Sequence, residues 1–391
     1  MCVRGVRAGN IGWMLSALVF CGVTAVVPVT AAQSANKTVR SNSVAVKDLI
    51  LSGAHRFDEP PLAFGVAVST VGDRVGYSPN LPQGGFVDPV SQPRYASHRL
   101  SAKWNGENNL SLGGSVAVRH FTSLRDRFKF STYRIDASYA LPALSVNTAT
   151  SLDISLGSNR ADQLHKNSYT QIGDNLIKQV TVNSPNDLFW RATLAQEQVL
   201  TGRTRYGFFS GVGQTISGHR GLLGTGVDGT GCSYDFQLYA NGGVVDQRDI
   251  CGDIYSMQRI YPDESSIESD LQVAPRKDMQ NNAWFYRVGG NLTTNFKRWQ
   301  TRLSFYHQRY VRDVLDQRIR SRGGKVYDRN NVVSLQATRY VNSSLSYSAT
   351  LEYNQHQFLD DLPVLYTRLT SDRFEGDVVY LTLQLNYLFG R

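Results

Sequence analysis

Apolar and polar side chains alternate along most of this chain with the period of two that marks a β-strand. The clearest run is Val379–Phe389, where apolar side chains occupy every second position and Tyr, Thr, Gln and Asn fill most of the positions between them. Strands of soluble sheets commonly end after about five or six residues. This run is long enough to cross a bilayer at a tilt.

The same alternation predicts twelve strands. They span Leu62–Val71, Tyr95–Asn105, Asn109–His120, Phe128–Ala140, Ser145–Gly157, Asp187–Val199, Thr204–Ile216, Asn282–Phe296, Trp299–Val311, Asn330–Tyr340, Ser344–Asn354 and Asp377–Phe389. Short connections, each of a few residues, alternate strictly with mostly long ones. This alternation requires an even number of strands with both ends on the same side, as in a membrane barrel.

The predicted fold is therefore all-β: a transmembrane antiparallel β-barrel over residues 62–391, with short periplasmic turns and long extracellular loops. Twelve strands fit best. The connection Ser217–Asn281 is long enough to hide two more strands, which would make fourteen.

The end of the chain carries a resemblance. A final amphipathic strand that closes on an aromatic, here Phe389, resembles the ends of Gram-negative outer-membrane β-barrel proteins of the porin-like kind. The resemblance implies an integral outer-membrane location, contact with outer-membrane lipid and lipopolysaccharide, and recognition of the last strand by the barrel-assembly machinery. Gly390 and Arg391 follow Phe389 and depart from the usual pattern, in which Phe is last.

The beginning of the chain predicts export. Arg4 and Arg7 precede an apolar stretch from Ile11 to Val29, and the small residues Thr30–Ala32 follow it. This is the arrangement of a cleaved signal peptide, here residues 1–32. We expect residues 33–61 to form a periplasmic segment or a small insert in the lumen.

Two cysteines remain after cleavage, Cys232 and Cys251, both in the longest connection. Asn241-Gly242, the strongest short hairpin signal, lies midway between them. Because exported proteins fold in an oxidising compartment, we expect these cysteines to form a disulfide across a hairpin.

The strand positions opposite to the apolar ones should face the lumen. The basic residues on that face are Arg99, Lys103, Arg119, Arg134, Arg191, Arg287 and Arg302, and the acidic ones are Asp136, Asp153, Glu197 and Glu352. A net-positive lining concentrates anions in a narrow pore. Alternatively, near neighbours such as Arg134 and Asp136 brace the barrel wall as salt bridges. Trp104, Trp190, Trp284 and Trp299 fall near strand ends on the outward face, where aromatic girdles belong.

These features predict an outer-membrane channel for small hydrophilic solutes of anionic character. We expect no enzyme activity, since no catalytic motif or metal-ligand spacing is present, and no cofactor. The formal charge of +9 could indicate nucleic acid, but an exported membrane barrel excludes that partner. The alternative is an export or assembly barrel for surface polysaccharide or lipoprotein, because the segment from Tyr327 to Phe389 resembles the barrel ends of those families.

Overall fold

The computed structural model describes residues 62–71, 94–106, 108–122, 127–142, 147–166, 170–247, 258–356, 359–360, 362–374 and 377–389. The predicted signal peptide, the segment 33–61 and Cys251 lie outside these residues, so the predictions for them stay predictions.

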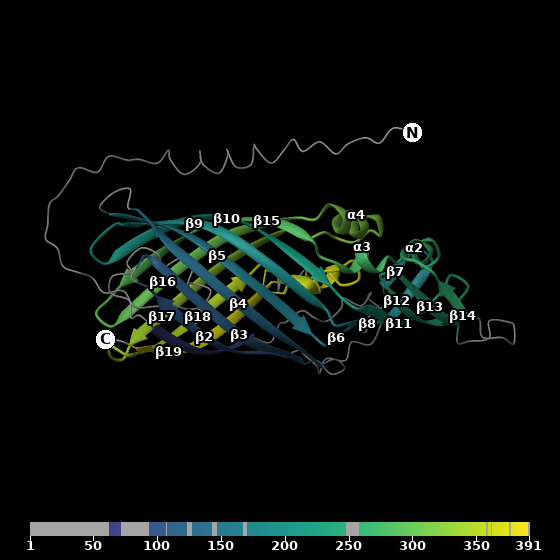
Figure 1. The fold of residues 1–391 in the computed structure, drawn as a ribbon, viewed down its shortest axis with the longest axis horizontal. Coiled ribbons are helices and arrows are strands. Elements are labelled where there is room, and N and C mark those ends of the chain that lie inside the picture. Colours follow the sequence, from purple (N-terminus) through teal and green to yellow (C-terminus); the bar gives the residue numbers. More distant parts are fainter. Residues whose placement is uncertain are drawn as a thin grey trace, which may run out of the picture. The chain divides into compact units, whose positions relative to one another are not determined.

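Twelve antiparallel strands form one closed barrel (Figure 1). In chain order they are β1 (Leu62–Val71), β2 (Arg94–Asn105), β3 (Leu110–Thr122), β4 (Arg127–Leu141), β5 (Thr148–Ala161), β9 (Asn186–Val199), β10 (Thr204–Gly218), β15 (Ala283–Asn295), β16 (Trp299–Val311), β17 (Arg329–Tyr340), β18 (Leu345–Asn354) and β19 (Val378–Phe389). Each pairs with its neighbours in this order, and β19 returns to β1 with Phe389 opposite Leu62. Closure leaves no strand edge unpaired, which a bilayer requires.

The outer surface of the barrel is apolar. Each of the twelve strands exposes at least one large hydrophobic side chain, such as Val66 on β1, Phe208 on β10 and Leu383 on β19. The side chains between them are mostly buried or half-buried, as the burial pattern of β19 illustrates. A bilayer-spanning barrel needs this division between an apolar outside and a polar inside.

All twelve predicted strands are present, and their observed bounds differ from the predicted ones by a few residues at most. Among its described residues, the connection Ser217–Asn281 holds four further strands rather than two, and they belong to a second sheet, so the barrel stays at twelve. The alternative of fourteen barrel strands is therefore wrong. Strands that follow one another in the chain can belong to different sheets.

The second sheet comes from two consecutive long connections. Its strands are β6 (Gln163–Lys166), β7 (Thr170–Ile172), β8 (Asn175–Asn183), β11 (Gly221–Val227), β12 (Ser233–Tyr239), β13 (Gly242–Gln247) and β14 (Gln258–Tyr261). Their order is β14-β13-β12-β11-β8-β6, with β7 also on β8. Because β8 leads into β9 and β10 leads into β11, the sheet continues directly from the barrel strands.

The predicted hairpin between the cysteines forms, but its register is shifted. Tyr239 lies opposite Gly242, so the two turn residues are Ala240 and Asn241 and not Asn241 and Gly242. Gly242 opens β13 with a φ of +139°, and a Cβ there would meet the carbonyl oxygen of Tyr261 at 2.5 Å. The neighbouring strand β14 thus fixes the register. Cys232 is buried immediately before β12.

Short helices complete the connections: α2 (Glu264–Leu271), α3 (Pro275–Met279), α4 (Asp313–Ser321), and the 3-10 turns η2 (Pro363–Leu365) and η3 (Ser371–Phe374). None of the helices in the described part of the chain has the length and apolar character needed to span a membrane. One hydrophobic cluster joins inward-facing barrel aromatics such as Tyr310 and Tyr380 to Leu365 and Tyr366 in the last connection.

Glycine positions let phenylalanine rings lie along the inner wall. Three cross-strand pairs share this arrangement: Gly157 with Phe189, Gly213 with Phe285, and Gly289 with Phe209. In each pair the ring tip occupies the place of a glycine side chain, since an added Cβ would come within 2.1, 2.4 and 2.6 Å of the respective ring carbon Cζ. A ring seated on the wall in this way does not cross the lumen.

Substituting Gly157→Ala should displace the Phe189 ring and destabilise the barrel by about 1–3 kcal/mol, the usual cost of overpacking. Urea unfolding of the detergent-folded protein, followed by tryptophan fluorescence, measures this change. The matched control is Gly114→Ala, where the nearest atom to the added Cβ lies at an ordinary 3.6 Å. Equal unfolding midpoints for the two variants would contradict the seating of the ring on the glycine.

Candidate functional site

The polar residues predicted for the lumen are buried or half-buried along the inner face of the barrel, whereas most of their chain neighbours are exposed. The buried members include Lys103, Asp136, Asp153, Glu197 and Arg302. Charged groups on this face must be stabilised by each other or by water. The backbone groups of the strands are not available to them, because they are already hydrogen-bonded to the neighbouring strands.

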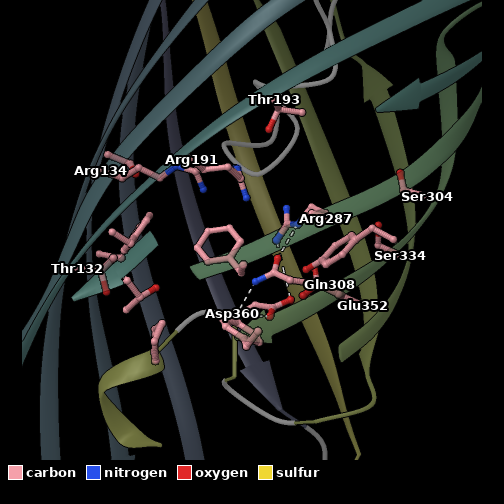
Figure 2. A pocket seen from close by; sticks show the side chains of 18 of the residues that line it. Thr132, Arg134, Arg191, Thr193, Arg287, Ser304, Gln308, Ser334, Glu352 and Asp360 are labelled. Atoms are coloured by element: carbon pink, nitrogen blue, oxygen red, sulfur yellow. Dashed lines mark hydrogen bonds and ion pairs between the residues drawn. The ribbon is translucent and has the colours of Figure 1, made fainter. Parts of the chain in front are cut away.

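One cavity of about 130 Å³ brings together five of the seven predicted basic residues. These are Arg99, Arg119, Arg134, Arg191 and Arg287, and the acids Glu352 and Asp360 also line it. Figure 2 shows Arg134, Arg191 and Arg287 around this space, with Asp360 beside it. Lys103 and Arg302 do not line it. We call this space the arginine cavity.

Strand register places arginines and aromatic rings next to each other on one wall of the cavity. Arg191 on β9 lies opposite Gly213 on β10, which lies opposite Phe285 on β15. Phe285 in turn lies opposite Tyr310 on β16, with ring centroids 5.7 Å apart. Arg287, two residues after Phe285, adds its guanidinium group to the same face of β15.

Arg134 and Arg287 have polar partners closer than 3 Å, and Arg99 donates to Gln384 at 3.3 Å. Arg134 donates to Asp136 at 2.8 Å, and the hydroxyl of Ser155 donates to the same carboxylate at 2.6 Å. This is the contact expected of a wall brace.

Arg287 donates to Gln308 at 2.8 Å and lies over the ring of Tyr306, 3.9 Å from its centroid. Its nearest carboxylate, Asp360, is 3.9 Å away. The oxygen Oδ1 of Asp360 accepts from the hydroxyl of Tyr310 at 2.6 Å. The Asp360 carboxylate thus accepts from a neutral hydroxyl as well, and its contact with Arg287 is long.

Arg191 differs from both. Its hydrogen bond goes to the neutral hydroxyl of Ser155, at 3.5 Å, and no carboxylate of the described residues lies within 4 Å of it. Arg134 and Arg287 are both close enough to act on its charge, and so is the carboxylate of Asp136, although it lies beyond ion-pair distance. A cation enclosed with two others and without a carboxylate partner favours an anion beside it.

Further along the lumen a second charged group forms around Glu197, which lies 3.5 Å from Arg302 and 3.7 Å from Arg205. Arg205 was not among the predicted lumen residues, although its position between the outward-facing Tyr206 and Thr204 follows the same alternation. Asp153, 1% exposed, accepts from Ser151 at 3.1 Å. These contacts are of the bracing kind.

The connection between β18 and β19 enters the barrel and covers part of the cavity. Its residues Asp360 and Pro363 line the cavity. The carbonyl of Pro363 accepts from Asn281 at 2.8 Å, and the amide of Val364 donates to Asp187 at 3.2 Å. We call the described residues of 355–377 the inward loop. No sequence signal indicated it, because the contacts that hold it inside the barrel are made with distant parts of the chain.

A buried carboxylate holds the inward loop in place. Asp278 in α3 is fully buried and accepts from Arg368 at 3.1 Å and from Arg318 in α4. The amide of Arg368 also donates to the carbonyl of Asp278 at 2.7 Å. Three connections of the chain therefore meet at Asp278.

The predicted girdle residues lie toward the two ends of the barrel. Trp104 and Trp299 are exposed beside short turns. Trp190 and Trp284 lie nearer the long connections, and their rings meet edge to face with centroids 5.7 Å apart. Within the described ranges, no group of His, Cys, Asp and Glu side chains is arranged to hold a metal ion.

No family model matches the chain, and no curated protein does. Solved structures that resemble it include the NanC porin, at 7% identity and a TM-score of 0.40 over 84% of this chain and 100% of that one. The toluene transporter TodX of Pseudomonas putida matches at 11% identity and 0.42, over 88% and 94% of the respective chains. The translocator domain of autotransporter NalP from Neisseria meningitidis matches at 8% and 0.42, over 85% and 90%. All three are outer-membrane β-barrels; the barrel assigned to this chain rests on its own strand pairing.

Substituting Arg368→Gln should loosen the inward loop, because losing one partner of a buried ion pair commonly costs about 3–5 kcal/mol. Chymotrypsin should then cleave after Tyr366 or Phe374, which are buried in the native protein, at least about ten times faster. The control is Lys277→Gln, which removes an exposed ion pair with Glu268. Unchanged cleavage in Arg368→Gln would show that the ion pair does not hold the loop.

Proposed function

We propose that this protein is an outer-membrane channel for small hydrophilic anions. The observation that carries the proposal is the arginine cavity in the barrel interior, above all Arg191, whose described neighbours include two arginines and no carboxylate within 4 Å. A positive lining within low-dielectric walls raises the local concentration of anions and repels cations.

The outer surface supports the membrane location. Its apolar side chains would each be exposed to water in a soluble protein, whereas in a bilayer they meet lipid. The partners that follow are outer-membrane lipid, lipopolysaccharide at the end with the long connections, and the barrel-assembly machinery at β19. The cleaved signal peptide belongs to the same proposal.

In this proposal the inward loop determines whether the channel is open or closed. Its packed residues, among them Leu365 and Tyr366, belong to the hydrophobic cluster at the end with the long connections. The position of the loop described above is, in this proposal, the closed state. In this proposal, solutes reach the arginine cavity past the inward loop, and conductance rises when the loop leaves the lumen.

The double variant Arg191→Gln/Arg287→Gln tests the channel and its selectivity. In a planar bilayer with a potassium chloride gradient, the reversal potential of the native protein should show anion preference. The double variant should lower the chloride-to-potassium permeability ratio at least about threefold, because two of the five arginines around the cavity are neutralised.

The matched control is Arg203→Gln/Arg298→Gln, which removes the same charge from exposed short turns and should leave the ratio unchanged. A native protein that folds but passes no ions under any condition would overturn the channel. Equal selectivity in the native protein and the double variant would overturn the role of the cavity.

A further inference from the structure

The arginine cavity is lined by aromatic rings as well as by charges. Phe189, Phe209, Phe285, Tyr306 and Tyr310 all border it. Inorganic anions use guanidinium and hydroxyl groups, but they leave ring faces uncovered. The rings therefore restrict the class of ligand further than the arginines alone do.

The rings flank Arg191 and Arg287. Along β9, Phe189 precedes Arg191 by two residues, so both side chains face the lumen. Along β15, Phe285 precedes Arg287 in the same way. Since Arg191 and Phe285 both lie opposite Gly213, a ligand at Arg191 also meets a phenylalanine ring.

The glycine pairs described above keep these rings against the wall. Because Phe285 and Phe189 lie over Gly213 and Gly157, their rings border the cavity without filling it. The free space of about 130 Å³ is close to that of an engineered cavity of about 150 Å³ in another protein, which holds one benzene ring. One six-membered ring with a small substituent is therefore the size that fits.

We propose that the arginine cavity binds a monocyclic aromatic carboxylate, with the carboxylate at Arg191 and Arg287 and the ring against Phe285 and its neighbours. A planar guanidinium group matches a carboxylate with two parallel hydrogen bonds. Aromatic rings attract each other in offset or edge-to-face contact. This inference rests on the proposed function, because it names the solute class of the same cavity.

Calorimetric titration of the full chain in detergent tests the ligand class without requiring ion flow. The probes are benzoate, benzamide, acetate and phosphate. Benzoate should bind at least about ten times more tightly than each of the other three, because it alone offers both the charge and the ring.

Two variants separate the contributions. Arg191→Gln should remove the preference for benzoate over benzamide, and Phe285→Leu should remove the preference for benzoate over acetate. Arg203→Gln, at an exposed turn, should change neither. A chymotrypsin-resistant inward loop in each variant confirms that the barrel is folded.

Equal affinity for benzoate and acetate, or for benzoate and phosphate, would overturn the aromatic ligand, and so would the absence of benzoate binding. The bilayer recording distinguishes this failure from that of the channel. Anion preference without benzoate selectivity leaves the channel standing and removes the ligand class. Selective benzoate binding in a barrel that never conducts supports the ligand class and overturns the channel.

Discussion

The need to pair every backbone donor and acceptor inside a bilayer is the constraint on which this structure depends. The chain meets it by closing twelve strands into a barrel, with β1 paired to β19. Closure assigns alternate side chains to lipid and to the interior, so most of the apolar strand residues face outward. The charged residues are left to fill the lumen, where their contacts with each other decide what the protein can bind.

Inside the barrel, charge compensation is uneven. Around Glu197, two arginines share one carboxylate and the group is braced. Around Arg191, the charges of Arg134 and Arg287 are opposed by that of Asp136 alone, which makes no ion pair with it. The fold accommodates this imbalance beneath an inward loop held by Asp278, and phenylalanine rings seated on glycines keep the space between them open. In this account the charged group around Glu197 stabilises the barrel, whereas the group around Arg191 binds the ligand.

The barrel could be predicted from sequence because a period of two is a local signal that membrane strands repeat along their whole length. The same parity placed Arg99, Arg191 and Glu352 inside, and a full count would have added Arg205. The inward loop could not be predicted. Asp360 and Arg368 meet partners about 50 to 90 residues away, and nothing in their own segment marks those contacts. The second sheet likewise depends on pairing between β8 and β11, which come from two separate connections, and the shifted register at Gly242 depends on β14, the next strand along the chain.

The most direct measurement is a crystal structure of the detergent-folded protein soaked in sodium bromide, with a parallel soak in rubidium chloride. Bromide is an anion whose anomalous scattering locates it without ambiguity. The account predicts a bromide ion beside the guanidinium group of Arg191 and no rubidium ion in the arginine cavity. A cavity free of bromide, or one that holds rubidium, would contradict the claim that it is an anion site.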